Sequence, residues 1–288
     1  MPRFLIAFAL LAVTAGAPVR AQTNDPHWQV SLSSYVSEGD YGTDASTRFT
    51  YAPLSLRWLA RRGDVTVIVP YLDVSSDSTV VIFRGMPQPT APQRMPTPTR
   101  PGADPQRGAA TPTPAPTPTS ILQTETTRVK GLGDMAVTGR YFLIEGGGWP
   151  MVDLTARIEL PTGDETRGLG LGAGSAELGL QLSKPLGRRF ITLADVSYTF
   201  VGRPEGFDVR NTWEYSAGLG CYPARSLLLS VSFEEWQPVS AGVANGRDVL
   251  ASATFKAGRS LRLFASAQFP LSETAPDFTA GGGVGVRF

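Results

Sequence analysis

The sequence predicts an all-β protein, a transmembrane antiparallel β-barrel of about twelve strands. Three observations lead to this prediction. Segments alternate between apolar and polar side chains, short and long connections alternate between the segments, and the last segment alternates up to a terminal phenylalanine. The stretch "MVDLTARIEL", residues 151–160, shows the alternation most clearly. Strand side chains repeat with period 2, so its aliphatic residues share one face and its charged residues share the other.

Two environments fit such a pattern. A soluble sheet buries the apolar face in a protein core, whereas an outer-membrane barrel turns that face toward lipid and keeps the charges in a wet interior. In the barrel, the even-numbered residues from Val152 to Leu160 would face lipid, while the odd-numbered residues from Asp153 to Glu159 would face the lumen. One segment does not decide between the two, so the choice rests on the remainder of the chain.

The chain opens with the features of a secretory signal peptide. Arg3 lies in a short basic region, an apolar run follows at 4–13, and "VRA" at 19–21 has small residues at both key positions of a cleavage site. The run is shorter than the ~20 apolar residues that a membrane-spanning helix requires. We expect a signal peptide at residues 1–21 and a mature domain at 22–288.

Composition narrows the class further. Removing 21 of the 288 residues leaves 267, enough for one large β domain. The only cysteine, Cys221, forms no internal disulfide, so stability must come from sheet closure and burial. The formal net charge is +1, from 26 basic and 25 acidic side chains, which gives no bulk attraction to nucleic acid.

The terminal segment "FTAGGGVGVRF" places small and apolar side chains on one face and ends at Phe288. It resembles the C-terminal signal strand of Gram-negative outer-membrane proteins, whose final aromatic residue is read by the barrel-assembly machinery. This likeness predicts an outer-membrane location. The expected partners are outer-membrane lipid, lipopolysaccharide and that machinery, and Phe288 is the expected assembly signal.

Twelve strands follow from alternation and turn residues. They are predicted at 27–37, 47–60, 64–76, 129–144, 150–161, 172–184, 189–201, 209–221, 226–238, 248–257, 260–270 and 278–288. Tight connections such as "ARRGD" and "KAGRS" alternate with longer ones, as do the periplasmic turns and extracellular loops of bacterial barrels. An even strand number returns both ends of the barrel to the periplasm.

The predicted inward face is strongly charged. It is too polar for a dry core, because each unpaired buried charge is costly. The candidate lumen-lining residues are Arg140, Asp153, Arg157, Glu159, Glu177, Gln181, Asp195, Arg210, Glu214, Glu234, Lys256 and Arg262. The alternative, that this face is the solvated outside of a soluble sandwich, leaves the terminal signal strand unexplained.

Aromatic residues near the strand ends fit the interfacial girdles of a barrel. Those expected on the periplasmic side are Trp28, Trp58, Trp149 and Phe190, and those expected on the outer side are Tyr71, Phe200, Trp213, Trp236 and Phe269.

Residues 85–127 break the pattern. This segment contains eleven prolines and almost no large apolar side chains. Such a chain cannot bury enough surface to offset the entropy lost on ordering, which predicts a disordered extracellular loop after the third strand. A surface spacer, a binding arm, a lid over the mouth and a tolerated insertion all remain open.

No motif predicts catalysis, a cofactor or a metal. The run "GLGLGAG" at 168–174 lacks the Lys-Ser/Thr and the helix of a phosphate-binding loop. The only histidine, His27, starts the first strand without a partner for acid–base or nucleophilic chemistry. There is no Cys/His cluster, and solvation explains the acidic loop residues better than calcium does. We therefore expect no enzyme and no cofactor.

The segments "GLGDMAVTGRYFL" and "DLTARIELPTGD", with the strands after them, resemble the outer-membrane family named for the MetA pathway of phenol degradation. Members are assigned a transport role by association, because they are often found beside genes of aromatic catabolism. Gly131–Asp134 and Leu160–Asp164 carry most of the likeness, which runs from residue 47 to the C-terminus apart from the proline-rich insert. The resemblance implies a barrel and supplies no catalytic motif.

Pattern and resemblance together favour a passive or weakly selective channel for small solutes, aromatic or other apolar compounds among them. A barrel of this size should have a narrow, partly occluded lumen. Inward arginines opposite inward carboxylates would then place a transverse field across the pore. In the alternative, these charges pair off and close the barrel, which leaves a structural or adhesive surface protein.

Overall fold

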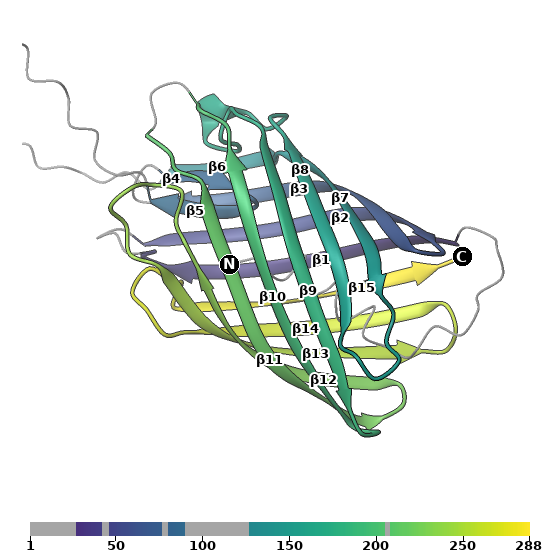
Figure 1. Cartoon of the computed structure of the whole chain (residues 1–288). Helices are drawn as coiled ribbons and strands as arrows, with labels where there is room; N and C mark the ends of the chain where they lie inside the picture. The colour runs from purple at the N-terminus through teal and green to yellow at the C-terminus, as the bar shows by residue number, and fades with distance from the viewer. Residues whose placement is uncertain (1–26, 42–45, 77–79, 90–126, 205–207) are drawn as a thin grey trace, which may run out of the picture.

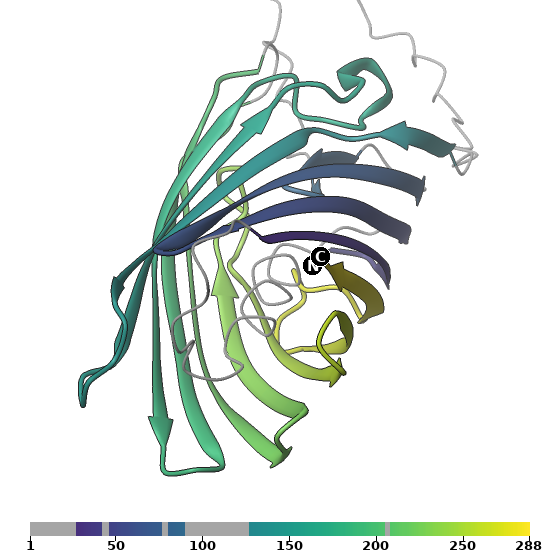
Figure 2. The ribbon, with the colours of Figure 1, turned by 90° about the vertical axis from the view of Figure 1, so that its right-hand side faces the viewer.

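The computed structural model describes residues 27–41, 46–76, 80–89, 127–204 and 208–288. These residues form one antiparallel barrel and a separate short hairpin (Figure 1). Seen from the end that carries the C-terminus, the strands are arranged in a ring (Figure 2). The wall strands are β1 (His27–Gly39), β2 (Thr47–Ala60), β3 (Gly63–Ser76), β6 (Thr127–Leu132), β7 (Met135–Ile144), β8 (Met151–Leu160), β9 (Ser175–Leu186), β10 (Phe190–Val201), β11 (Thr212–Ala224), β12 (Leu227–Trp236), β13 (Gly246–Ala257), β14 (Leu261–Pro270) and β15 (Phe278–Arg287). The hairpin consists of β4 (Val80–Phe83) and β5 (Met86–Pro89), and one short 3-10 helix, η1 (Glu165–Arg167), lies in a long connection.

The wall closes on itself. β1 pairs with both β15 and β2, and β2 pairs with β3, which closes the ring, while β6 pairs on one side only, with β3. β6 and β7 pair with successive parts of β3 and together occupy one strand position of the barrel. The 13 strands of the sheet therefore fill twelve strand positions, which confirms the predicted closed antiparallel barrel.

The fourth predicted strand is interrupted. Ile68–Tyr71 of β3 oppose Leu132–Ala136, so four residues face five and the extra residue makes a β-bulge. Pro70 has no N–H to donate to the ladder, and its carbonyl accepts a hydrogen bond from the Gly133 amide at 3.0 Å. The bulge falls at Gly133–Asp134, where the aspartate is released for contacts outside the wall. Elsewhere the boundaries are close to expectation; β9 and β11 each begin three residues late.

The alternating faces have the orientation expected of a membrane barrel. In β8, Leu154 and Ile158 are exposed on the outside, whereas Arg157 and Glu159 are buried inside. β12 repeats the arrangement, and Val231 is 54% exposed. The apolar face therefore points away from the interior, as lipid contact requires.

Aromatic side chains follow the same rule with one exception. The side chains predicted on the periplasmic side are exposed, namely Trp28, Trp58, Trp149 and Phe190. Four of those predicted on the outer side are exposed as well, namely Tyr71, Phe200, Trp213 and Phe269. The prediction for Trp236 was wrong: its side chain is only 2% exposed. Trp236 lies two residues after Glu234 on β12, so both side chains are on the same face of the strand and point inward.

Glycines of the last strand make room for rings inside the barrel. A Cβ at Gly281 would lie 2.0 Å from Cδ1 of Tyr35, and one at Gly283 would lie 2.5 Å from Cζ of Phe264. Substitution at either glycine would therefore displace a packed aromatic ring.

The C-terminal residue closes the ladder. The Phe288 amide donates to the Trp28 carbonyl at 2.9 Å, and the Trp28 amide donates back at 3.0 Å. Recognition of Phe288 by the assembly machinery stays a prediction. The predicted signal peptide lies outside the described residues.

Candidate functional site: a hairpin inside the barrel mouth

The β4–β5 hairpin occupies the end of the barrel that carries the long connections. Its strands pair with each other and belong to no wall sheet. Ile82 and Met86 join the cluster of buried side chains from β1, β2 and β3, while Phe83 packs with Leu171 and Val239 of two long connections. The Ile82 amide also donates to a loop carbonyl, that of Gly168, at 3.3 Å. The hairpin is thus held inside the mouth by contacts from several sides.

This hairpin corrects the start of the predicted disordered insert. The prediction placed its first residue at 85, yet Gly85–Pro89 complete an ordered hairpin, and Met86 is 1% exposed. Proline content marked the boundary too early, because the few apolar side chains before residue 90 pack inside the barrel. Residues 90–126 of the predicted insert lie outside the described part of the chain.

The tip of the hairpin has an unusual backbone. Arg84 and Gly85 have φ of 54° and 72°, the left-handed values that a two-residue hairpin turn requires. A Cβ at Gly85 would lie 2.5 Å from the Tyr51 ring, so only glycine fits there. Arginine in this conformation costs about 1 kcal/mol or more, which points to a role for its side chain.

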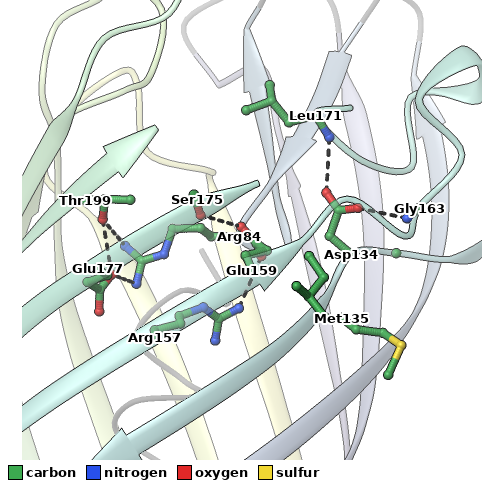
Figure 3. A network of polar contacts seen from close by, with 12 residues as sticks. Arg84, Asp134, Met135, Arg157, Glu159, Gly163, Leu171, Ser175, Glu177 and Thr199 are labelled. Atoms are coloured by element: carbon green, nitrogen blue, oxygen red, sulfur yellow. Dashed lines mark hydrogen bonds and ion pairs between the residues drawn. The ribbon is translucent and has the colours of Figure 1, made fainter. Parts of the chain in front are cut away.

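That side chain reaches the opposite wall. The Arg84 guanidinium forms an ion pair with Glu177 and donates to Oγ1 of Thr199 at 3.3 Å (Figure 3). It also forms an ion pair with Glu214 at 3.2 Å. Burial alone would lower the pKa of Arg84, but the carboxylates of Glu177, Glu214 and Glu159 raise it above its ordinary value. Arg84 is therefore a charged link between the hairpin and the wall.

Five carboxyl groups line the wall that Arg84 faces. We call them the acidic arc; it comprises Glu177, Asp195, Glu214, Glu234 and Asp248, one from each of β9 to β13. Glu234 and Asp248 are direct cross-strand neighbours with no exposed surface, and the Gln268 amide donates to each at 3.4 Å. Arg84 brings one positive charge to this arc.

A second polar network lies beside the first. Arg157 donates to Oε1 of Glu159 at 3.2 Å, and the Ser175 hydroxyl donates to Oε2 of the same carboxylate at 3.2 Å (Figure 3). Because these residues lie on the adjoining β8 and β9, they extend the charged wall toward the bulge at Asp134.

Asp134 fastens the loop that supports the hairpin. Its carboxylate accepts hydrogen bonds from the amide of Gly163 at 2.8 Å and from that of Leu171 at 3.2 Å (Figure 3). The amide of the next residue, Met135, donates to the Thr162 hydroxyl at 2.9 Å. The motifs "GLGD" and "LPTGD", which carry the family likeness, thus meet at this contact. The loop then presents the Gly168 carbonyl to the hairpin.

Charges at the other end of the barrel are arranged differently. Asp64 accepts from Arg57 at 2.6 Å and from Nε of Arg140 at 3.1 Å, and all three side chains are buried. Asp153, Lys256 and Arg262 also point inward from the wall at this end and are half-buried. The described interior therefore has an acid-rich mouth and a base-rich opposite end.

Eleven of the twelve candidate lumen residues point toward the interior of the barrel, and their lining of a solute path stays a prediction. The inward-pointing candidates are Arg140, Asp153, Arg157, Glu159, Glu177, Gln181, Asp195, Glu214, Glu234, Lys256 and Arg262. Arg210 is the exception: it precedes β11 and donates to the Pro238 and Val243 carbonyls of another loop, at 3.1 and 3.3 Å. Its prediction as a wall residue rested on a strand that begins too early.

Five charged residues of this interior were missed. Arg57, Asp64, Asp248 and Arg287 have the inward parity of their predicted strands, so applying the alternation to every predicted strand would have found them. Arg84 gave no such signal, because it adjoins the proline-rich segment and no predicted strand contains it.

Two further findings concern the described residues. No group of three or more His, Cys, Asp or Glu side chains among them is arranged to hold a metal ion. Within the same residues, no helix has the length and apolar character needed to span a membrane.

Fold, outward apolar face and charged interior define the class: an outer-membrane β-barrel, located as the sequence predicts. The chain belongs to the family described as "Putative MetA-pathway of phenol degradation", whose match covers residues 47–288. This confirms the resemblance seen in the sequence. A search of curated protein sequences gives no match.

One solved structure shares the barrel fold, and two others align less closely. The COG4313 outer membrane channel from Pseudomonas putida F1 aligns with a TM-score of 0.62 at 12% identity, covering 95% of this chain and 98% of that one. The translocator domain of the autotransporter NalP from Neisseria meningitidis aligns at 0.49 with 10% identity, covering 99% and 95%. The P. putida toluene transporter TodX aligns at 0.42 with 11% identity, covering 92% and 89%. At 12% identity the first likeness concerns the fold alone.

Proposed function

We propose that this barrel is an outer-membrane channel for small solutes, aromatic and other apolar compounds among them, and that the β4–β5 hairpin is its removable plug. The observation that carries the proposal is the hairpin's independence of the wall. It forms its own two-stranded sheet, so it can leave the mouth without breaking a hydrogen bond of the wall ladder. A two-stranded hairpin is marginally stable alone, so its position depends on its side-chain contacts.

The surfaces that the hairpin covers suggest the solute class. On one side lie the rings of Tyr35, Phe49 and Tyr51, which contact one another at centroid distances of 6.4 and 6.2 Å. On the other side lies the acidic arc. Withdrawal of the hairpin would uncover an aromatic wall facing a polar one, which suits small aromatic molecules with a polar group.

Conductance and liposome uptake of phenol by the purified barrel test this proposal, with wild type compared to a deletion of residues 80–89. We expect low conductance and slow uptake in wild type and a severalfold increase in the deletion variant. Heat-dependent gel migration should show that both barrels are assembled. An assembled deletion variant that conducts no ions and admits no phenol would contradict the proposal.

The second candidate is a non-transporting structural or adhesive barrel. The burial of the hairpin and the ion pairs of Arg84 favour it, because both fill the mouth. It predicts that the hairpin contributes stability and nothing else. The deletion variant would then unfold more easily and stay impermeable.

A further inference from the structure

A row of positive charges lies on the inner wall at the end with the short turns. It consists of Lys256 on β13, Arg262 on β14 and Arg287 on β15, and we call it the basic row. Lys256 is directly opposite Arg262, Arg262 is opposite Gly285, and Arg287 is two residues further along β15. Directly opposite side chains on a sheet start about 5 Å apart, so these cations are near neighbours.

Two of the three cations, Lys256 and Arg262, have no ion-pair partner among the described residues. Across the described residues, neither Lys256 nor Arg262 has a carboxylate within the 4.0 Å of an ion pair. The recorded partner of the Arg262 guanidinium is a backbone carbonyl, that of Leu261, at 3.1 Å. By contrast, Asp64 on β3 pairs with both Arg57 on the adjacent β2 and Arg140 on the adjacent β7. Like charges opposite each other are unfavourable, particularly when half-buried, unless an anion joins them.

Neutral donors adjoin the row. Gln29 on β1 is opposite Arg287, and its side-chain amide donates to the Ser31 hydroxyl at 3.0 Å. A Cβ at Gly285 would lie 2.7 Å from that hydroxyl and 3.2 Å from the Gln29 amide nitrogen. Glycine at 285 therefore leaves these groups beside the guanidinium groups instead of covering them.

We propose that the basic row is a binding site for the oxyanion of a small solute, either a carboxylate or a phosphate. Arginine guanidinium groups match both anions through paired charge-assisted hydrogen bonds, and lysine adds a point charge. Anion binding would offset the repulsion within the row. The inference rests on the proposed function only for its consequence in transport, namely a preference for anions at the inner end of the channel.

Calorimetric titration of the purified full-length barrel tests the binding, with benzoate and inorganic phosphate as separate probes. The variant K256Q/R262Q/R287Q removes the row. The control R188Q/R225Q/R259Q removes the same charge from exposed turn residues at the same end. We expect at least about tenfold weaker binding in the row variant and no change in the control. Tighter binding of one probe identifies the carboxylate or the phosphate as the group recognised.

Two results overturn the site: no binding of either anion to wild type, or equal binding by all three proteins. If the triple variant fails to assemble, as judged by heat-dependent gel migration, R262Q is compared with R259Q in the same titration. Reversal potentials in a salt gradient separate this inference from the proposed function. Anion binding by a barrel that never conducts contradicts the channel and leaves the site intact. Conductance without any shift toward cations in the row variant contradicts the site alone.

Discussion

The wall and the hairpin are both antiparallel β-structure, yet different forces hold them. Apart from β6, which pairs with β3 alone, every described wall strand has partners on both sides, and the ladder closes through β1 and β15. The hairpin has one ladder, between β4 and β5, and is otherwise attached by buried side chains and by Arg84. The difference teaches that stability and permeability can be altered separately. Changes in the wall should unfold the protein, whereas changes around the hairpin should open it.

The buried ion pairs of the wall should give the largest effect on stability. Asp64→Ala leaves Arg57 and Arg140 buried without their shared carboxylate, and breaking a buried pair in this way costs about 3–5 kcal/mol. Urea unfolding of the refolded barrel measures the loss. The control is Asp73→Ala on the same strand, whose partners Arg128 and Lys130 are exposed and which should cost at most about 1 kcal/mol. Equal losses in both variants would contradict the burial of the ion pairs of Asp64.

The second largest effect on stability is expected from a change on the lipid-facing side of the wall. Val231 lies at the middle of β12 and points outward, so Val231→Arg places a charge in lipid and should cost about 2–4 kcal/mol. Val231→Ala corrects for loss of the valine side chain. Unfolding in phospholipid vesicles is the measurement. A variant with arginine at 231 that is as stable as the alanine variant would place this face in water.

The support of the hairpin should show a smaller effect on stability and a larger one on conductance. Asp134→Ala removes the acceptor of the Gly163 and Leu171 amides, which we expect to cost about 1–2 kcal/mol. Loosening this loop should also raise conductance, because the Gly168 carbonyl no longer holds Ile82 in place. Asp164→Ala in the same loop is the control, since its carboxylate accepts from Thr166 and Arg167 within one turn. Unchanged conductance of the Asp134→Ala variant would show that the loop does not position the hairpin.

The wall was predictable from the sequence because its signal is local. Alternation within each strand fixes which residues point inward, as Arg157 and Glu159 show, and turn residues separate the strands. The error at Trp236 arose because its position near a strand end was given more weight than the alternation of inward and outward side chains along the strand. The bulge at Gly133–Asp134 depends on Pro70 in a distant strand, so the pattern within residues 129–144 could not indicate it.

The candidate site was less predictable because it depends on contacts between distant segments. Arg84 meets Glu177 and Glu214 across about a hundred residues of chain. The apolar residues of the hairpin are few, and the prolines that follow dominate the composition. Conversely, the motif residues at 131–134 and 160–164 were visible, but their meeting around Asp134 required the fold.

The accessibility of the hairpin tests most directly whether it is a plug separable from the wall. Met86→Cys, in a background where Cys221→Ser removes the native thiol, places a reporter on a side chain that is 1% exposed. A membrane-impermeant thiol reagent should label it slowly in the otherwise unchanged barrel. With Glu177→Gln and Glu214→Gln added, the ion pairs of Arg84 are lost, and we expect labelling at least about tenfold faster, together with higher conductance and unchanged heat-dependent migration. Labelling that stays slow in an assembled double-glutamine variant, or that rises only when the barrel unfolds, would contradict the separable plug.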